Sequence, residues 1–92
     1  MRKAIDIRIY GHVFNVGFRR YVHRYALECD VVGYVENDHA LDCVHIFAEG
    51  EELKLDQFVL YCGEGTPYST ITNMKIDPAT VTGKYTRFEQ IR

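Results

Sequence analysis

The sequence predicts an α+β fold, with two helices packed on one face of a five-stranded, mainly antiparallel sheet. Five segments have the apolar alternation of strands, and two have the three-and-four spacing of helices. Their order is strand-helix-strand-strand-helix-strand with a short terminal strand, which is typical of a ferredoxin-like α/β sandwich. A chain of 92 residues has room for one such unit, so we assign residues 1–92 to a single domain.

The first half of the chain alternates clear strand and helix patterns. Residues 3–10 predict a strand, because isoleucines alternate there with polar residues. Residues 18–28 predict a helix, because apolar side chains recur three and four positions apart until Asp30 ends the pattern. Residues 31–37 predict the second strand, and residues 37–40 have the composition of a turn.

The second half repeats the pattern with weaker signals. Residues 41–48 predict the third strand, with the even-numbered residues from 44 onward facing inward. A second helix is expected from residues 50–52, whose acidic side chains suit a helix start, to a stop formed by Gly63, Gly65 and Pro67. The remaining expected elements are a fourth strand at 71–76, a loop at 78–84 and a final strand at 87–91.

Composition excludes several classes of function. The net charge is −2 and the pI about 6.0, so no general basic surface is available for a nucleic-acid backbone. No run of 18 apolar residues occurs, which excludes a membrane-spanning helix. The first residues lead directly into a strand and lack the apolar segment of a signal peptide. We therefore expect a cytoplasmic protein.

Three cysteines, Cys29, Cys43 and Cys62, lie within apolar patterns. Their odd number and wide spacing indicate neither a secreted disulfide framework nor a metal-binding pair, and buried inert thiols are expected. A disulfide between Cys29 and Cys62 stays open if the two helices lie side by side. No cluster in the sequence has the spacing of metal ligands, so we expect no metal and no cofactor.

The most informative stretch joins the first strand to the first helix. A loop bracketed by Gly11 and Gly17 can direct several backbone N–H groups into one concavity, and the helix N-terminus adds partial positive charge. Arg19 and Arg20 fall in the first helical turn, where a cation costs about 0.3–1 kcal/mol. A bound anion would turn this conflict into an attraction. From their position alone, it is equally reasonable that both arginines point into solvent and bind no anion.

Three sequence blocks together resemble the acylphosphatase family. They are GHVFNVGFR at residues 11–19, GYVEN at 33–37 and AEG at 48–50. The resemblance covers nearly the whole chain, and the first two blocks at this separation are a specific pair. It implies hydrolysis of a small-molecule acyl phosphate without a metal or a covalent intermediate, by a monomer that inorganic phosphate inhibits.

The same resemblance implies a role for each residue of the site. The phosphate-binding residues are Asn15, Val16, Gly17, Phe18 and Arg19, and the catalytic residues are Arg19 and Asn37. The guanidinium suits phosphate because its planar fork donates paired hydrogen bonds. The amide of Asn37 suits the attacking water because it donates and accepts without a repelling charge. A carboxylate is a good leaving group and needs no general acid. Catalysis then requires only that the charge on the phosphoryl oxygens is stabilised and that a water is oriented.

Two positions depart from the usual family motif, Val-Gln-Gly-Val-Gly-Phe-Arg. Phe14 replaces the glutamine and Asn15 replaces the first glycine. We expect a positive φ at Asn15, which asparagine tolerates at about 1 kcal/mol, so the loop keeps its shape under some strain. Phe14 removes a polar group beside the site and is expected to affect rate and substrate preference more than the reaction. Arg20 is expected on the surface.

Two alternatives to an acylphosphatase stay open. One is a catalytically weak acylphosphatase-like domain that binds carbamoyl or acyl phosphate, as at the start of a hydrogenase-maturation carbamoyltransferase. The end of the chain just after the last strand argues against it. The other is a nucleic-acid-binding ferredoxin-like domain, which the acidic balance and the missing RNA-recognition signature disfavour.

Overall fold

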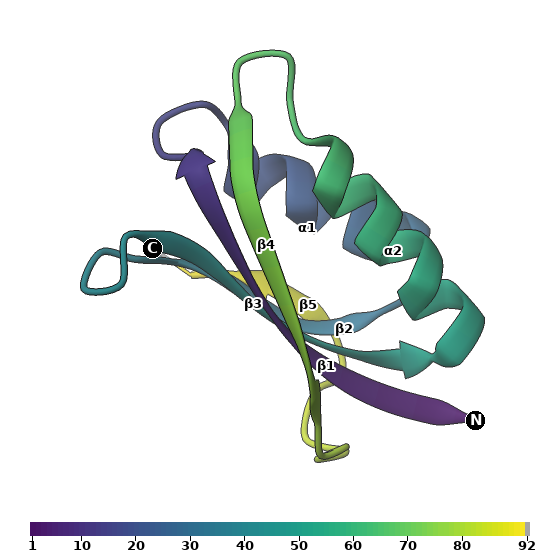
Figure 1. Ribbon diagram of the computed structural model, residues 1–92. Coiled ribbons are helices and arrows are strands. Elements are labelled where there is room, and N and C mark those ends of the chain that lie inside the picture. Colours follow the sequence, from purple (N-terminus) through teal and green to yellow (C-terminus); the bar gives the residue numbers. More distant parts are fainter. Residues whose placement is uncertain (92) are drawn as a thin grey trace.

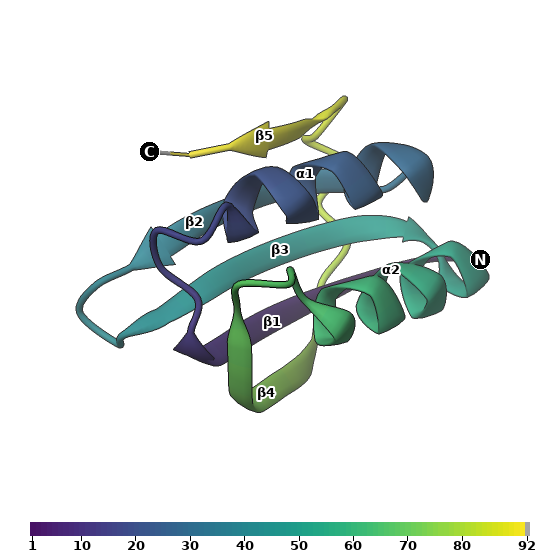
Figure 2. The ribbon, with the colours of Figure 1, turned by 90° about the horizontal axis from the view of Figure 1, so that it is seen from above.

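The computed structural model describes residues 1–91 and has two layers, a twisted sheet and a pair of helices (Figure 1). The elements are β1 (Arg2–His12), α1 (Phe18–Glu28), β2 (Val32–Asp38), β3 (Cys43–Glu51), α2 (Glu52–Glu64), β4 (Thr70–Ala79) and β5 (Phe88–Gln90). The five strands have the order β4-β1-β3-β2-β5. Both helices lie on one face of the sheet, as the view from above shows (Figure 2). The predicted ferredoxin-like α+β fold is confirmed.

The sheet is antiparallel except at one edge. β1 pairs with β3 and with β4, and Ile7 lies opposite both Ile46 and Ile76. β5 pairs in parallel with β2, and Gly33 lies opposite Phe88. This last pairing brings the end of the chain beside the segment that ends in Asp38.

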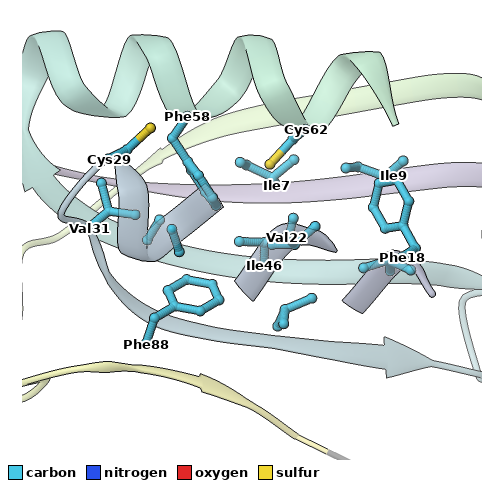
Figure 3. Close-up of a cluster of buried hydrophobic side chains, with 14 of the residues drawn as sticks. Ile7, Ile9, Phe18, Val22, Cys29, Val31, Ile46, Phe58, Cys62 and Phe88 are labelled. Atoms are coloured by element: carbon cyan, nitrogen blue, oxygen red, sulfur yellow. The ribbon is translucent and has the colours of Figure 1, made fainter. Parts of the chain in front are cut away.

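The core lies between the sheet and the helices (Figure 3). Helix α1 buries Phe18, Val22 and Ala26, which are four positions apart and therefore share one face. Helix α2 contributes Leu55, Phe58 and Cys62 in the same way. The strands supply alternate residues from their inner faces, and they include Ile7, Ile9, Val35, Val44, Ile46 and Ala48. The predicted inward set of the third strand is confirmed.

Three element boundaries differ from the prediction, each for a local reason. The turn after β2 extends past residue 40, because the Asp38 carboxylate accepts a hydrogen bond from the Leu41 N–H at 3.0 Å. Pro78 lies inside β4, which an edge strand permits because the missing N–H needs no partner. Helix α2 continues through Gly63 and ends before Gly65, whose φ of 70° suits glycine.

All three cysteines are buried and free, as the sequence predicts. Cys29 lies just after α1 and Cys62 lies in α2, and both belong to the same core cluster (Figure 3). Burial raises the pKa of the Cys62 thiol well above its usual value. The disulfide that the sequence left open is not formed, and both thiols act as small apolar side chains.

The connection from β4 to β5 crosses the sheet face opposite the helices (Figure 2). Its Tyr85 ring packs against Phe47 and Tyr34, with centroid separations of 5.5 and 6.0 Å. Beneath it lies Glu49, which is fully buried and accepts a hydrogen bond from the Thr82 N–H. Burial alone would raise the pKa of the Glu49 carboxyl, but hydrogen bonds from Thr82 and Gly83 lower it below its usual value. Glu49 therefore anchors this loop as a carboxylate.

This anchor predicts a specific sensitivity to acid. A folded-state pKa below the unfolded value gives stability that is present above the unfolded pKa, about 4.5 here. That stability disappears as the pH falls through the folded pKa. At pH 7, Glu49→Gln should lower the free energy of unfolding by about 1.5–3 kcal/mol, the size of a hydrogen bond to a charged group. Urea unfolding of parent and variant from pH 7 to pH 3 should show this difference shrinking. A constant difference would mean that the charge of Glu49 is not what holds the loop.

Candidate active site

The loop between β1 and α1 is held in place at both ends. Val13 and Phe18 are buried in the core, with 2% and 1% of their surfaces exposed. Between them the Val16 side chain packs against the same core. The Val16 carbonyl accepts a hydrogen bond from the Thr66 hydroxyl at 3.3 Å. The loop is therefore preset before any ligand binds.

The backbone of this loop leaves its donors free. Asn15 has a φ of 59° and Gly17 a φ of 73°, so the predicted positive φ at Asn15 is confirmed. The first bond of α1 runs from the Tyr21 N–H to the Gly17 carbonyl at 3.0 Å. Within residues 1–91, the N–H groups of residues 14–20 have no backbone acceptor, and no side chain caps the helix. Unpaired N–H groups at a helix N-terminus are suited to an anion.

A pocket of about 240 Å³ opens over this loop. Its lining residues are Val13, Asn15, Gly17, Phe18, Arg19, Arg20, Asn37 and Gln90. Asn37 comes from the end of β2 and Gln90 from β5, so three separate elements meet there. The lining includes two arginines and no acidic residue, and it therefore favours an anionic ligand.

Asn37 places a free acceptor beside the anion site. Its side-chain oxygen, Oδ1, is buried and has no hydrogen-bond partner among residues 1–91. An unpaired buried amide oxygen costs about 1–3 kcal/mol, so it needs a compensating partner such as a water or a ligand hydrogen. Asn37 itself lines the pocket, and a side-chain amide, which both donates and accepts, suits the orientation of a water molecule.

Arg19 is oriented by the last strand. Its Nη1 donates a hydrogen bond of 2.8 Å to the Ile91 carbonyl. This carbonyl is positioned because the Ile91 N–H donates to the Val35 carbonyl at 2.8 Å, and the Gly33 N–H donates to the Arg87 carbonyl at 3.1 Å. A guanidinium has five N–H donors, so most of them stay available for an anion.

The pocket unites most of the residues that the sequence predicts. Asn15, Gly17, Phe18, Arg19 and Asn37 all line it. The side chain of Val16 packs on the core instead, which leaves its backbone as the group that can contribute.

Three lining residues were missed or placed differently. Val13 and Gln90 gave no chemical signal, and the parallel pairing that brings Gln90 to the site joins distant segments. Arg20 is exposed, as expected, but it also lines the pocket. Its place beside Arg19 in the first helical turn was the available signal.

Phe14 lies away from the pocket. Its ring packs against the His39 ring with a centroid separation of 4.9 Å, and it contacts the hydrophobic core. Phe14 therefore joins the β1–α1 loop to the β2–β3 turn, and it does not line the site as its place in the sequence suggested.

Two features are absent from the described residues, a cluster of metal ligands and a membrane-spanning helix. Within residues 1–91, no group of three or more His, Cys, Asp or Glu side chains is placed to hold a metal ion. No helix in this part of the chain is long and apolar enough to cross a membrane.

Comparison with known proteins identifies the family. A model described as "Acylphosphatase" matches residues 5–90. The chain belongs to the acylphosphatase family. It is 38% identical over 88 residues to an acylphosphatase of Archaeoglobus fulgidus, which covers 94% of each chain. It also matches the crystal structure of acylphosphatase from Bacillus subtilis with a TM-score of 0.91 and 30% identity over the whole of both chains. The reaction is the hydrolysis of acyl phosphates to a carboxylate and inorganic phosphate.

Another solved structure matches this chain with only a small part of its own length. The crystal structure of full-length HypF in a phosphate- and nucleotide-bound form matches all of this chain with a TM-score of 0.91 and 29% identity. Only 12% of the HypF chain is covered. The same domain shape therefore also occurs inside a much longer protein.

The strained backbone at Asn15 leads to a prediction about the loop. Asn15→Val places a β-branched side chain at a φ of 59°, where such residues are outliers. The loop should distort, with weaker phosphate binding and lower kcat. Asn15→Gly should change the free energy of unfolding by less than about 1 kcal/mol and preserve activity, because relief of strain and the added freedom of the unfolded chain oppose each other. Calorimetric phosphate titration of both variants tests this. Parent-like binding by Asn15→Val would show that the loop conformation is not needed for the anion.

Proposed function

We propose that the residues lining this pocket carry out the hydrolysis by direct attack of water on the bound phosphoryl group. The backbone N–H groups from Asn15 to Arg19 and the Arg19 guanidinium hold the phosphoryl oxygens. Asn37 orients the attacking water through its side-chain amide. The observation that carries the proposal is that Asn37 lines the same pocket as the anion-binding loop and Arg19.

The chemistry needs no further group from the protein. Water attacks phosphorus, the bond between phosphorus and the acyl oxygen breaks, and the carboxylate leaves with the bonding electrons. The protons of the water stay on the inorganic phosphate or pass to solvent. The leaving group needs no proton, and no lining residue is an acid that could supply one readily. The guanidinium and the loop amides place positive charge around the phosphoryl oxygens. This stabilisation of negative charge is the larger part of phosphoryl-transfer catalysis.

The proposal predicts a selective and metal-independent enzyme. Benzoyl phosphate should be hydrolysed far faster than p-nitrophenyl phosphate, because an ester leaving group gains more from an acid than a carboxylate does. Excess EDTA should leave the rate unchanged, and inorganic phosphate should inhibit competitively. Initial rates on both substrates, with and without EDTA, test these points. Loss of activity on chelation would contradict the assignment of charge stabilisation to Arg19 and the loop.

A binding role without efficient turnover is the second candidate. The match to one segment of full-length HypF favours it, since that domain lies within a longer chain. The same assay separates the two, because a binding domain would bind phosphate in calorimetry and hydrolyse benzoyl phosphate no faster than buffer. For the remaining properties we propose a monomer in the cytoplasm, where three free cysteines are usual.

A further inference from the structure

The pocket is larger than a phosphoryl group requires. Its volume of about 240 Å³ equals roughly eight water molecules at the volume each has in the liquid. The five heavy atoms of a phosphate and one attacking water occupy only part of this space. The proposed binding of the phosphate and the water gives no role to three lining residues, Arg20, Gln90 and Val13. They surround the space that the acyl group has available.

Arg20 is the exception among the arginines of α1. Arg19 donates to the Ile91 carbonyl, and the Arg24 guanidinium lies over the Tyr25 ring at 5.6 Å from its centroid. Within residues 1–91, Arg20 forms no ion pair and no hydrogen bond. No acidic residue lies in the first turn of the helix to offset its charge.

The charges at the pocket exceed what one phosphoryl group neutralises. Two guanidinium groups and the helix N-terminus, which carries about half a unit charge, sum to roughly +2.5. A phosphoryl group carries about −1.5 to −2 at neutral pH. With no carboxylate in the lining, a positive remainder is left, and it lies at Arg20 because Arg19 is engaged by the phosphate.

We infer that Arg20 forms a subsite for an anionic group on the acyl part of the substrate. The inference rests on the proposed function, since it assumes that Arg19 and the loop hold the phosphoryl group. The favoured substrates are acyl phosphates whose acyl group carries a carboxylate or a second phosphate. The amide of Gln90 on β5 provides a neutral donor on the same lining. Arg20 is thus a specificity-determining residue of this chain.

Two matched substrates test the subsite. The first is 3-carboxybenzoyl phosphate, and the second is 3-carbamoylbenzoyl phosphate, a neutral molecule of nearly the same shape. Each kcat/KM is divided by the rate of spontaneous hydrolysis of the same compound, which corrects for leaving-group reactivity. The parent should prefer the carboxylate about two- to fivefold at low salt, the size of one ion pair at an exposed site. The preference should fall as salt screens the exposed charge.

Two variants decide which residue is responsible. Arg20→Gln should reduce the preference to about one. Arg24→Gln removes the same charge from the next turn of the same helix, outside the pocket, and should keep the parent preference. A parent without preference, or an Arg20→Gln variant that keeps it, would overturn the subsite.

A binding measurement makes the result independent of turnover. Benzoylphosphonates with the same carboxylate and carboxamide groups cannot be hydrolysed, and calorimetry gives the Kd of each. The parent should bind the carboxylate compound about two- to fivefold more tightly than the carboxamide, and Arg20→Gln should bind the two compounds equally. Failure to hydrolyse any benzoyl phosphate would refute the proposed function alone. Equal binding of both phosphonates by the parent would refute the subsite alone.

Discussion

Arg19→Gln is expected to reduce kcat/KM for acyl phosphate hydrolysis by about 10²–10³-fold or more while the fold stays intact. The loss corresponds to about 3–4 kcal/mol, the usual cost of removing one donor that stabilises transition-state charge. Arg19 is only partly buried and belongs to the first turn of α1, so its removal leaves the core unchanged. The variant also loses the hydrogen bond to the Ile91 carbonyl, which adds disorder to the end of β5. Steady-state kinetics with benzoyl phosphate and circular dichroism of the variant check both parts.

Phosphate binding provides an independent measure of the same residue. A ligand that binds only the folded protein stabilises it by about 2.7 kcal/mol at a hundred times its Kd, so inorganic phosphate should raise the Tm of the parent. The shift should vanish in Arg19→Gln and persist in Arg24→Gln, whose side chain is outside the pocket. A phosphate-induced shift that survives in Arg19→Gln would place the anion elsewhere on the surface.

The fold could be predicted because its signals are local. Alternating isoleucines in β1 and the four-residue spacing of Phe18, Val22 and Ala26 in α1 bury one face of each element. Once the order of strands and helices is known, few arrangements bury all of these faces together. Boundaries were less accurate where one side chain decides them, as Asp38 does by capping the turn to Leu41.

The site could be predicted only in part, because two of its eight lining residues, Asn37 and Gln90, come from distant segments. The loop from Val13 to Phe18 is continuous, so it could be matched to the family motif, whose first glycine implied the positive φ at Asn15. Gln90 reaches the pocket only because β5 adds to the sheet in parallel beside β2. No residue pattern near Gln90 encodes that pairing.

Glu49 shows the same limit on the sheet face opposite the helices. A strand pattern places it on the face opposite the helices, where a charged residue is ordinary. It is buried because the β4–β5 loop, more than 30 residues later, lies over it and supplies the N–H of Thr82. The consequence reaches the site, since this loop leads into the strand that holds Arg19 through Ile91.

Asn37→Ala is expected to lower kcat strongly while phosphate binds almost as tightly as in the parent. In the proposed mechanism the side chain orients the attacking water and makes no contact that the anion requires, so the loss should fall on the chemical step. Removal of Oδ1 also removes a buried acceptor without a partner, and the free energy of unfolding should not fall by the amount usual for a lost hydrogen bond. Single-turnover rates, the Kd of phosphate and urea unfolding measure the three quantities separately.

Asn73→Ala is the matched control for this variant. Asn73 lies on β4, outside the pocket, and its side-chain oxygen accepts a hydrogen bond from the Met74 N–H at 2.9 Å. Its replacement should leave kcat and phosphate affinity unchanged. If Asn37→Ala lost phosphate affinity in parallel with kcat, Asn37 would shape the end of β2 and the turn beside the loop. Its buried oxygen would then stabilise the conformation of the site. The attacking water would need a different partner, and Gln90 is another side-chain amide on the same lining.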